Sequence, residues 1–142
     1  MPKPTQRHRK ETLVATKRIG FTGTRQGMTL RQQEELKALL PGGCHFHHGD
    51  CIGADAQAHK IAREKNCYIV AHPSNRSRQR AYCVCNEHLL PKPPLTRNRA
   101  IVEAVDGLIG APATSHEVLR SGTWATIRYA RKVGKPIHIL EP

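Results

Sequence analysis

The sequence has few aromatic residues and no long apolar run, and both absences narrow what the protein can do. Aromatic residues make up 4% of the 142 positions, so an array of side chains that stack on nucleic-acid bases is not expected. No apolar stretch approaches the roughly 18 residues that a membrane-spanning helix needs. The N-terminus is polar, so no signal peptide is predicted. We therefore expect a cytoplasmic protein with no membrane partner.

The number and spacing of the cysteines argue against two kinds of structure. The five cysteines are an odd number scattered through the chain, unlike the disulfide framework of a small secreted protein. In structural zinc sites the two cysteines of a pair are usually separated by about two to four residues. The pairs in this sequence have other spacings, Cys44-x6-Cys51 and Cys83-Val-Cys85. Alternation along a strand at 44–48 would divide the neighbouring histidines between two faces. We predict no metal and no cofactor. If a metal does bind, Cys83 and Cys85 are the expected ligands.

Positive charge is concentrated in two segments. The chain has 23 Lys and Arg against 11 Asp and Glu, a formal net charge of +12. Residues 1–18 and residues 76–99 each carry six Lys or Arg and one Glu, and the remainder is nearly neutral. Residues 1–17 contain two prolines and no periodicity, so we predict a flexible basic tail that binds nucleic acid non-specifically. Residues 18–142 have the length of one domain.

Short apolar runs alternate with amphipathic segments throughout this domain. Runs typical of buried strands lie at 18–22, 44–48, 67–71, 107–110 and 137–140. Among the helices predicted between them, one begins at Thr29 with a capping box to Gln32, and the last begins at Ser121. Residues 72–95 contain four prolines and are predicted to be a long loop. The alternation predicts an α/β fold with a mainly parallel sheet of about five strands, order 3-2-1-4-5, between two helix layers.

Three glycine-containing turns follow predicted strands, and the expected strand order places them at one edge of the sheet. They lie at 23–25, 49–55 and 120–123. Main-chain amides at a helix start, together with Thr and Arg side chains, bind phosphate or carboxylate. In such sheets the ligand lies where the winding reverses, between the first and fourth strands. The pattern therefore predicts an anion site there, although neither GxGxxG nor a Walker motif is present.

Four segments resemble one superfamily: GFTGTR, HHGDCIGADAQA, LTRNRAIVEAVDGLIG and RSGTWATIRYARKVGKPI. They are similar to the SLOG superfamily of Rossmann-like domains, which includes the lonely-guy phosphoribohydrolases, the DNA-processing protein A family and nucleotide-sensing domains. The resemblance covers about residues 18–140 and is closest to small stand-alone members. It implies a single Rossmann-like, three-layer domain that binds a nucleotide or nucleotide-derived phosphorylated ligand at the C-terminal edge of the sheet. We also expect a homo-oligomer, a dimer or higher.

The resemblance assigns roles to particular residues. In the lonely-guy enzymes an Arg on the helix before the fourth strand contacts the phosphate and ribose, and the matching position is Arg97. Those enzymes also carry PGGxGTxxE, whose Glu assists cleavage of the N-glycosidic bond. The matching stretch keeps Gly122 and Thr123 but has Thr126 in place of the Glu, and a hydroxyl cannot replace a carboxylate as proton donor. The remaining catalytic candidates are Asp50, Asp55 and Glu117.

The predicted ligand site draws on all three glycine turns and on the helix before the fourth strand. Its residues are Gly23, Thr24, Arg25, Gly49, Asp50, Gly53, Asp55, Arg97, Asn98, Arg120, Ser121, Gly122 and Thr123. Three functions stay open: binding of the ligand without turnover, an N-glycosidase or phosphoribohydrolase activity on nucleotides, and DNA binding of the DNA-processing type. The missing Glu favours the first over the second. The location of the excess charge in a tail and one loop argues against the third.

Overall fold

The computed structural model describes residues 18–142, and the predicted basic tail lies outside them. The elements in chain order are β1 (Arg18–Gly23), α2 (Leu30–Leu39), β2 (His45–His48), α3 (Ala54–Glu64), β3 (Tyr68–Ala71), the 3-10 helix η1 (Ser77–Gln79), β4 (Glu87–His88), α4 (Pro94–Ala104), β5 (Gly107–Ala111), α5 (Gly122–Lys132) and β6 (Ile137–Ile139). Within this range no helix is both long and apolar enough to cross a membrane.

The sheet has six strands, all parallel, in the order β4-β3-β2-β1-β5-β6. The five predicted strands occur in the predicted order, which in these labels is β3-β2-β1-β5-β6. The strand count needs a correction, because β4 adds a sixth strand beside β3. It lies in the β3–α4 segment, residues 72–93, most of the stretch predicted to be a loop. Both residues of β4 are exposed, so no apolar run marks this strand in the sequence.

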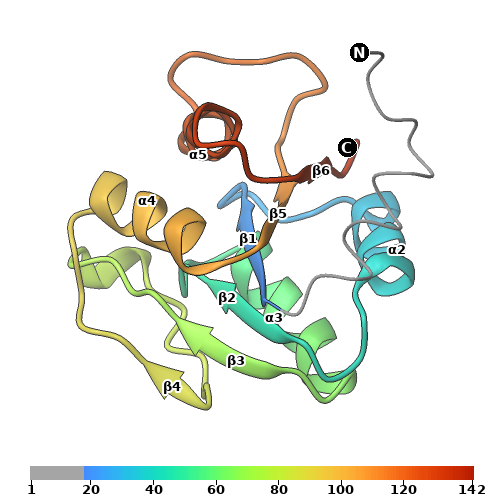
Figure 1. Ribbon diagram of the computed structural model, residues 1–142, viewed down its shortest axis with the longest axis vertical. Helices are drawn as coiled ribbons and strands as arrows, with labels where there is room; N and C mark the ends of the chain where they lie inside the picture. The colour runs from blue at the N-terminus through green and yellow to red at the C-terminus, as the bar shows by residue number, and fades with distance from the viewer. Residues whose placement is uncertain (1–17) are drawn as a thin grey trace.

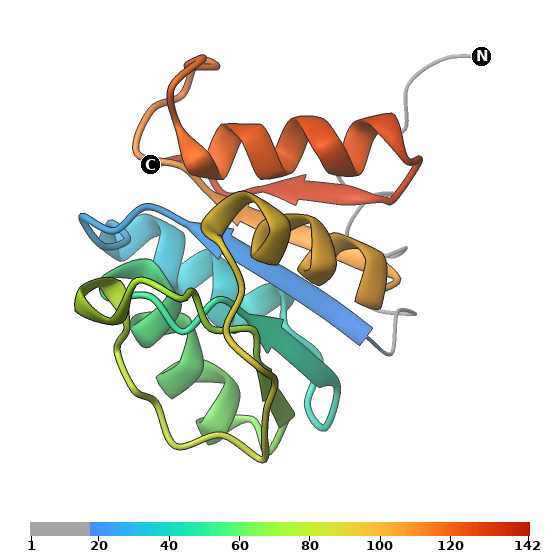
Figure 2. The ribbon, with the colours of Figure 1, turned by 90° about the vertical axis from the view of Figure 1, so that its left-hand side faces the viewer.

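Helices cover both faces of the sheet, as the two ribbon views show (Figures 1 and 2). The helices α2 and α3 share one core cluster with Phe46, and α4 and α5 share another with Leu108 on the opposite face. Glycines in β1 and β5 allow the second pair of helices to approach closely. A Cβ at Gly110 would lie 2.8 Å from Cδ1 of Ile127, and one at Gly20 would lie 3.0 Å from side chains of α4 and its C-cap. The three-layer arrangement predicted from the alternation is therefore present.

Two helices begin at the capping residues predicted from the sequence. The hydroxyl of Thr29 accepts from the main-chain N–H of Gln32 at 3.1 Å, and Oε1 of Gln32 accepts from the N–H of Thr29 at 3.0 Å. Ser121 caps α5 with a 3.1 Å bond from the N–H three residues on. Gln32 is also buried, and its Nε2 donates to the carbonyls of Pro112 at 2.8 Å and Leu140 at 3.0 Å. This side chain ties α2 to the chain just beyond β5 and β6.

Candidate ligand-binding cleft

A cleft of about 630 Å³ lies at the C-terminal edge of the sheet, where the strand order reverses between β1 and β5. In Figure 2 the segments after β1, before α5 and around η1 all lie on this side of the sheet. The residues that line the cleft are Phe21, Thr22, Gly23, Thr24, Arg25, Gln26, Gly49, Cys51, Ile52, Asp55, Arg76, Gln79, Pro94, Arg97, Asn98, Ile101, Ala113, Thr114, Val118, Arg120, Ser121, Gly122 and Thr123. All the predicted ligand-binding residues are among them except Asp50 and Gly53.

The turn after β1 forms one wall of the cleft and rests on the turn after β2. The carbonyl of Thr24 accepts from the N–H of Ala54 at 3.0 Å. Gly53 has a φ of +87°, and a Cβ at this position would overlap the main-chain carbonyl of Arg25. Glycine is therefore required here, both for the backbone conformation and for the close approach. Gly53 does not line the cleft, but it lets the second turn support the first.

The first turn of α5 forms the opposite wall. Ser121 is the N-cap, and Gly122 and Thr123 are the first helical residues. Their main-chain N–H groups have no carbonyl partner within the helix and lie at the positive end of its dipole. The exposed Arg120 precedes them. A helix start of this kind, with a guanidinium beside it, can bind phosphate or carboxylate.

Arg97 lines the cleft, but most of its guanidinium is occupied by the protein itself. Nη1 donates to the carbonyl of Gly49 at 2.6 Å and to that of His72 at 3.2 Å. Nε donates to Oδ1 of Asn98 at 2.7 Å, and Nη2 lies 3.4 Å from Sγ of Cys51. Since a guanidinium has five N–H donors, one N–H of Nη2 is left for a ligand. Arg97 therefore braces the turn after β2, a role that the resemblance did not imply.

Two of the three catalytic candidates point away from the cleft. Asp50 is fully buried, and its carboxylate accepts from the N–H of Cys83 at 2.9 Å and from Nε of Arg80 at 3.2 Å. It therefore anchors the β3–α4 segment. Glu117 is exposed and pairs with Arg128 and Arg131 of α5 at 3.1 and 3.2 Å. Neither carboxylate lines the cleft.

Asp55 is the one carboxylate that lines the cleft among the residues described. Its Oδ2 accepts from the N–H groups of Gly49 at 3.1 Å and Cys51 at 3.2 Å. Burial raises the pKa of Asp55 to about 6, against the opposing effects of the Arg97 guanidinium and these two hydrogen bonds. A carboxyl group whose pKa lies this close to neutrality can both hold and release a proton at physiological pH.

Two side chains of α5 are kept out of the cleft by their own contacts. Oγ1 of Thr126 donates to the carbonyl of Gly122 at 2.9 Å, so the position of the lonely-guy Glu supplies no group to the cleft. Trp124 is 4% exposed, and its Nε1 donates to Oγ1 of Thr114 at 3.2 Å. It packs in the core cluster that α5 shares with α4 and is not placed to stack on a ligand.

Arg76 and Gln79 also line the cleft, although no motif in the sequence predicts them there. They reach it because the β3–α4 segment folds back over the turn after β2. The carbonyl of Gln79 accepts from the N–H of Ile52 at 3.0 Å, and Cys51 forms an antiparallel bridge with Arg80. The charge excess of residues 76–99 was the available signal, but a segment without periodicity does not reveal where it folds.

The fold is that of a Rossmann-like α/β domain, which confirms the fold implied by the motifs. Three solved structures share it. DNA processing protein A (DprA) from Streptococcus pneumoniae matches with a TM-score of 0.67 and 19% identity, over 90% of this chain and 51% of that one. The molybdenum cofactor binding protein from Rippkaea orientalis matches with a TM-score of 0.65 and 19% identity, over 85% and 74%. The structural-genomics target TM1055 matches with a TM-score of 0.63 and 16% identity, over 85% and 72%.

At these identities the likeness concerns the fold, and this chain spans about half the length of DprA. No protein-family model matches the sequence, and a search of curated proteins finds no match. The chemistry of the site therefore depends on the side chains and main-chain groups of this chain.

Proposed function

We propose that this protein binds a nucleotide or a nucleotide-derived phosphorylated ligand in the cleft. One observation carries the proposal: the first-turn amides of α5 and three exposed arginines surround a cleft in which Asp55 is the single carboxylate among residues 18–142. The arginines are Arg25, Arg76 and Arg120, and they come from three different segments. Together with the helix start they favour a compact anion such as a phosphate group.

The rest of the cleft suits the remainder of such a ligand. Its volume of about 630 Å³ falls within the usual size range of small-molecule sites. Ile52, Pro94 and Val118 provide apolar surface for a base or a sugar, and the side chains of Gln79 and Asn98 can donate or accept hydrogen bonds. That a molybdenum cofactor binding protein shares this fold supports a ligand-binding role.

Calorimetry with the four nucleoside 5′-monophosphates and the matching nucleosides tests the proposal. We expect the monophosphates to bind more tightly, because the arginines and the α5 amides contact the phosphate. Removing a hydrogen bond to a charged group costs about 1.5–3 kcal/mol, so Arg120→Ala should weaken monophosphate binding by about tenfold or more.

Arg131→Ala is the matched control, because it removes the same charge from the other end of α5 and Arg131 does not line the cleft. Its affinity for monophosphates should equal that of the wild type. Monophosphates that bind no better than nucleosides would refute the proposal, and so would equal losses in Arg120→Ala and Arg131→Ala.

A second candidate function, N-glycosidic cleavage of the bound nucleotide, is favoured by one observation: the cleft contains Asp55, whose pKa is raised to about 6. A carboxyl of this kind can protonate a leaving base, whereas an arginine cannot. If the wild type releases free base and ribose 5-phosphate from a monophosphate, Asp55→Asn should abolish the release and leave ligand affinity nearly unchanged. A wild type that releases no base carries out binding alone.

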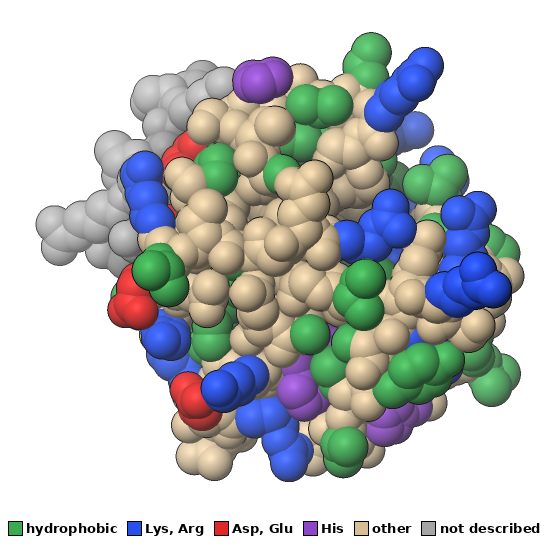
Figure 3. Space-filling model, turned by 180° about the vertical axis from the view of Figure 1, so that it is seen from behind, with side chains coloured by type: hydrophobic (Ala, Val, Ile, Leu, Met, Phe, Trp, Pro, Cys, Tyr) green, Lys and Arg blue, Asp and Glu red, His purple; other side chains and the backbone are tan. Residues whose placement is uncertain are grey.

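The charge of the whole chain supports non-specific nucleic-acid binding as an additional property. The formal net charge is +12, and on the face shown in Figure 3 Lys and Arg side chains are widespread and acidic ones sparse. Cationic proteins of this kind release counterions when they bind phosphate backbones, so the affinity falls steeply with salt. The predicted homo-oligomer, a dimer or higher, can be checked by light scattering on the same samples.

A further inference from the structure

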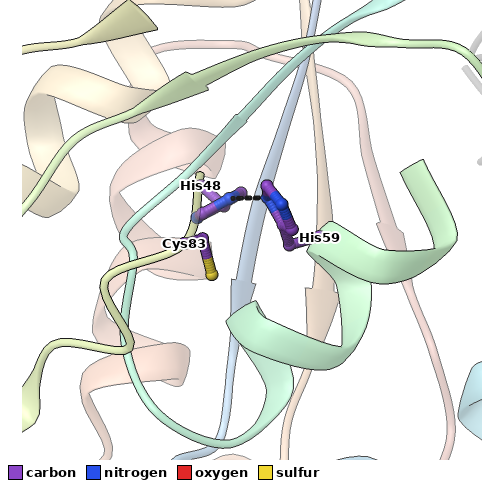
Figure 4. A group of neighbouring side chains, drawn as sticks. All are labelled: His48, His59 and Cys83. Carbon is purple, nitrogen blue, oxygen red and sulfur yellow. Dashed lines mark hydrogen bonds between the residues drawn. The ribbon is translucent and has the colours of Figure 1, made fainter. Parts of the chain in front are cut away.

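A cluster of two imidazoles and two thiols lies outside the cleft, at the C-terminal end of β2. His48 is the last residue of β2, His59 lies in α3, and Cys83 and Cys85 belong to the β3–α4 segment. None of the four lines the cleft. Figure 4 shows His48, His59 and Cys83 gathered between the end of β2, α3 and the β3–α4 segment.

Three ligand atoms of this cluster, from His48, His59 and Cys83, are close enough to share one metal ion, and the sulfur of Cys85 lies beside the two histidines. One ligand atom from each of His48, His59 and Cys83 lies within 4.8 Å of the other two. Nε2 of His48 is 3.1 Å from Nδ1 of His59, and Sγ of Cys85 is 3.8 Å from both nitrogens. With Zn–N bonds of about 2.0 Å and Zn–S bonds of about 2.3 Å, neighbouring ligands of a tetrahedral site lie about 3.3–3.8 Å apart. The observed distances are near these values, and a tetrahedral site would form once the Cys83 and Cys85 side chains rotate to face the same point.

We propose that His48, His59, Cys83 and Cys85 bind a zinc ion. Imidazole nitrogen and thiolate sulfur are the donors that Zn²⁺ prefers in proteins, and a set of two each leaves no open position for a substrate. His48 is fully buried and the other three residues are half-buried. The ion would thus be shielded from water on the side of the sheet and reachable from the side of the loop.

The hydrogen bonds of His48 indicate that this residue contributes least to the affinity for zinc. The main-chain N–H of Asp50 donates to Nδ1 of His48 at 2.9 Å, so in the neutral ring the proton is on Nε2, where it faces His59. Ligation through Nε2 requires this proton to move to Nδ1 and the N–H of Asp50 to turn away. The two thiols lose their protons to solvent when they bind the ion. We therefore expect His59, Cys83 and Cys85 to supply most of the affinity.

The ion would fix the β3–α4 segment to the body of the domain. It would join the end of β2, α3 and the residues just before β4, and it would add to the bonds that Asp50 already makes to Cys83 and Arg80. Because a metal that binds only the folded chain raises its stability, Zn²⁺ should raise the melting temperature whatever the cleft binds.

Metal binding is tested on the full chain, reduced and freed of metal, with Zn²⁺ and with Co²⁺ as its spectroscopic substitute. We expect one Co²⁺ per chain, with the absorption of a tetrahedral thiolate complex, and its displacement by Zn²⁺. The double variant Cys83→Ser/Cys85→Ser should lose at least about 100-fold in Zn²⁺ affinity, the upper end of what loss of an outer-shell contact costs. His59→Gln should lose more affinity than His48→Gln.

The matched control is Cys67→Ser. Cys67 is also a free thiol, but its sulfur lies 3.4 Å from that of Cys44, which directly precedes β2. It should keep wild-type Zn²⁺ affinity. The proposal is overturned if the double variant binds Zn²⁺ as tightly as the wild type, or if Cys67→Ser loses as much as the double variant.

A measurement on the wild type alone keeps the test decisive even if the double variant does not fold. Zn²⁺ should protect Cys83 and Cys85 from a thiol-modifying reagent, with the modified residues identified by mass spectrometry. Protection of both cysteines supports the site. Protection of neither, or protection confined to Cys44 and Cys67, overturns it.

Discussion

Replacing Gly53 by alanine should destabilise the protein where the turn after β2 supports the turn after β1. Gly53 combines a φ of 87° with a ψ of −126°, a conformation in which side chains are strained. The added Cβ would also overlap the main-chain carbonyl of Arg25. A side chain could rotate out of the way, but this carbonyl belongs to a turn that is fixed by the bond between the N–H of Ala54 and the carbonyl of Thr24.

The size of the effect can be worked from these two contributions. Backbone strain in a glycine-only region costs about 1–3 kcal/mol, and forcing an extra methyl group into a packed contact costs about 1–3 kcal/mol. We therefore expect Gly53→Ala to lower the free energy of unfolding by about 4 kcal/mol, a large share of the roughly 5–15 kcal/mol typical of a domain.

Gly43→Ala separates the two contributions. Gly43 also has a positive φ, +74°, but a Cβ there meets nothing within 4 Å, so only a strain cost of about 1–2 kcal/mol is expected. Urea unfolding followed by circular dichroism measures both variants, and the midpoints should fall without a change in the slope with denaturant. Equal losses in Gly53→Ala and Gly43→Ala would refute the reasoning, because the close approach at Gly53 would then contribute nothing.

Three further predictions test other parts of the structure. Burial raises the pKa of Asp55 from 3.8 to about 6. The stability contributed by its neutral form is therefore complete below about pH 4 and is lost as the pH rises through 6. In urea unfolding between pH 4 and pH 7, the free energy of unfolding of the wild type should fall by up to about 3 kcal/mol relative to that of Asp55→Asn. Arg97→Ala leaves the carbonyls of Gly49 and His72 without their donor and should cost about 2–4 kcal/mol of stability even without ligand; an unchanged melting temperature would mean that Arg97 serves the ligand alone. Deleting residues 1–16 should weaken non-specific DNA binding and reduce its salt dependence, while nucleotide affinity stays unchanged; equal loss of both affinities in filter-binding and calorimetric assays would show that the tail contributes to the cleft.

The fold was predictable because local signals and topology agree. The capping pair Thr29 and Gln32 and the cap Ser121 lie within a few residues of the helices they start, so their effect can be read without knowing the tertiary structure. The strand order follows from the handedness of strand–helix–strand connections. The strand β4 was missed because its two exposed residues are held by pairing with Val70 and Ala71, a contact between segments and not a local pattern.

The candidate site was predictable as a place, but the direction of each side chain was not. Turns after parallel strands must meet at one edge, which is why most of the predicted residues line one cleft. Asp50 lies in the turn after β2 and Asp55 in the first turn of α3, and only Asp55 lines the cleft. Asp50 has a positive φ of 54°, which the sequence does not reveal. Likewise the sequence around His59 is that of a surface histidine on a helix. Only the folded β3–α4 segment places two thiols beside it.

The central place of β1 in the sheet determines the order in which the chain can assemble. Residues of β1 pair with β2 after 27 positions, as Arg18 does with His45, but with β5 only after 88, as Ile19 does with Gly107. A growing chain therefore exposes one unpaired edge of its first strand until residues 107–111 have been synthesised. Pairing across such a long stretch of chain is slow to form. The two turns that carry Gly23 and Gly49 are synthesised long before the first turn of α5, which forms the opposite wall of the cleft.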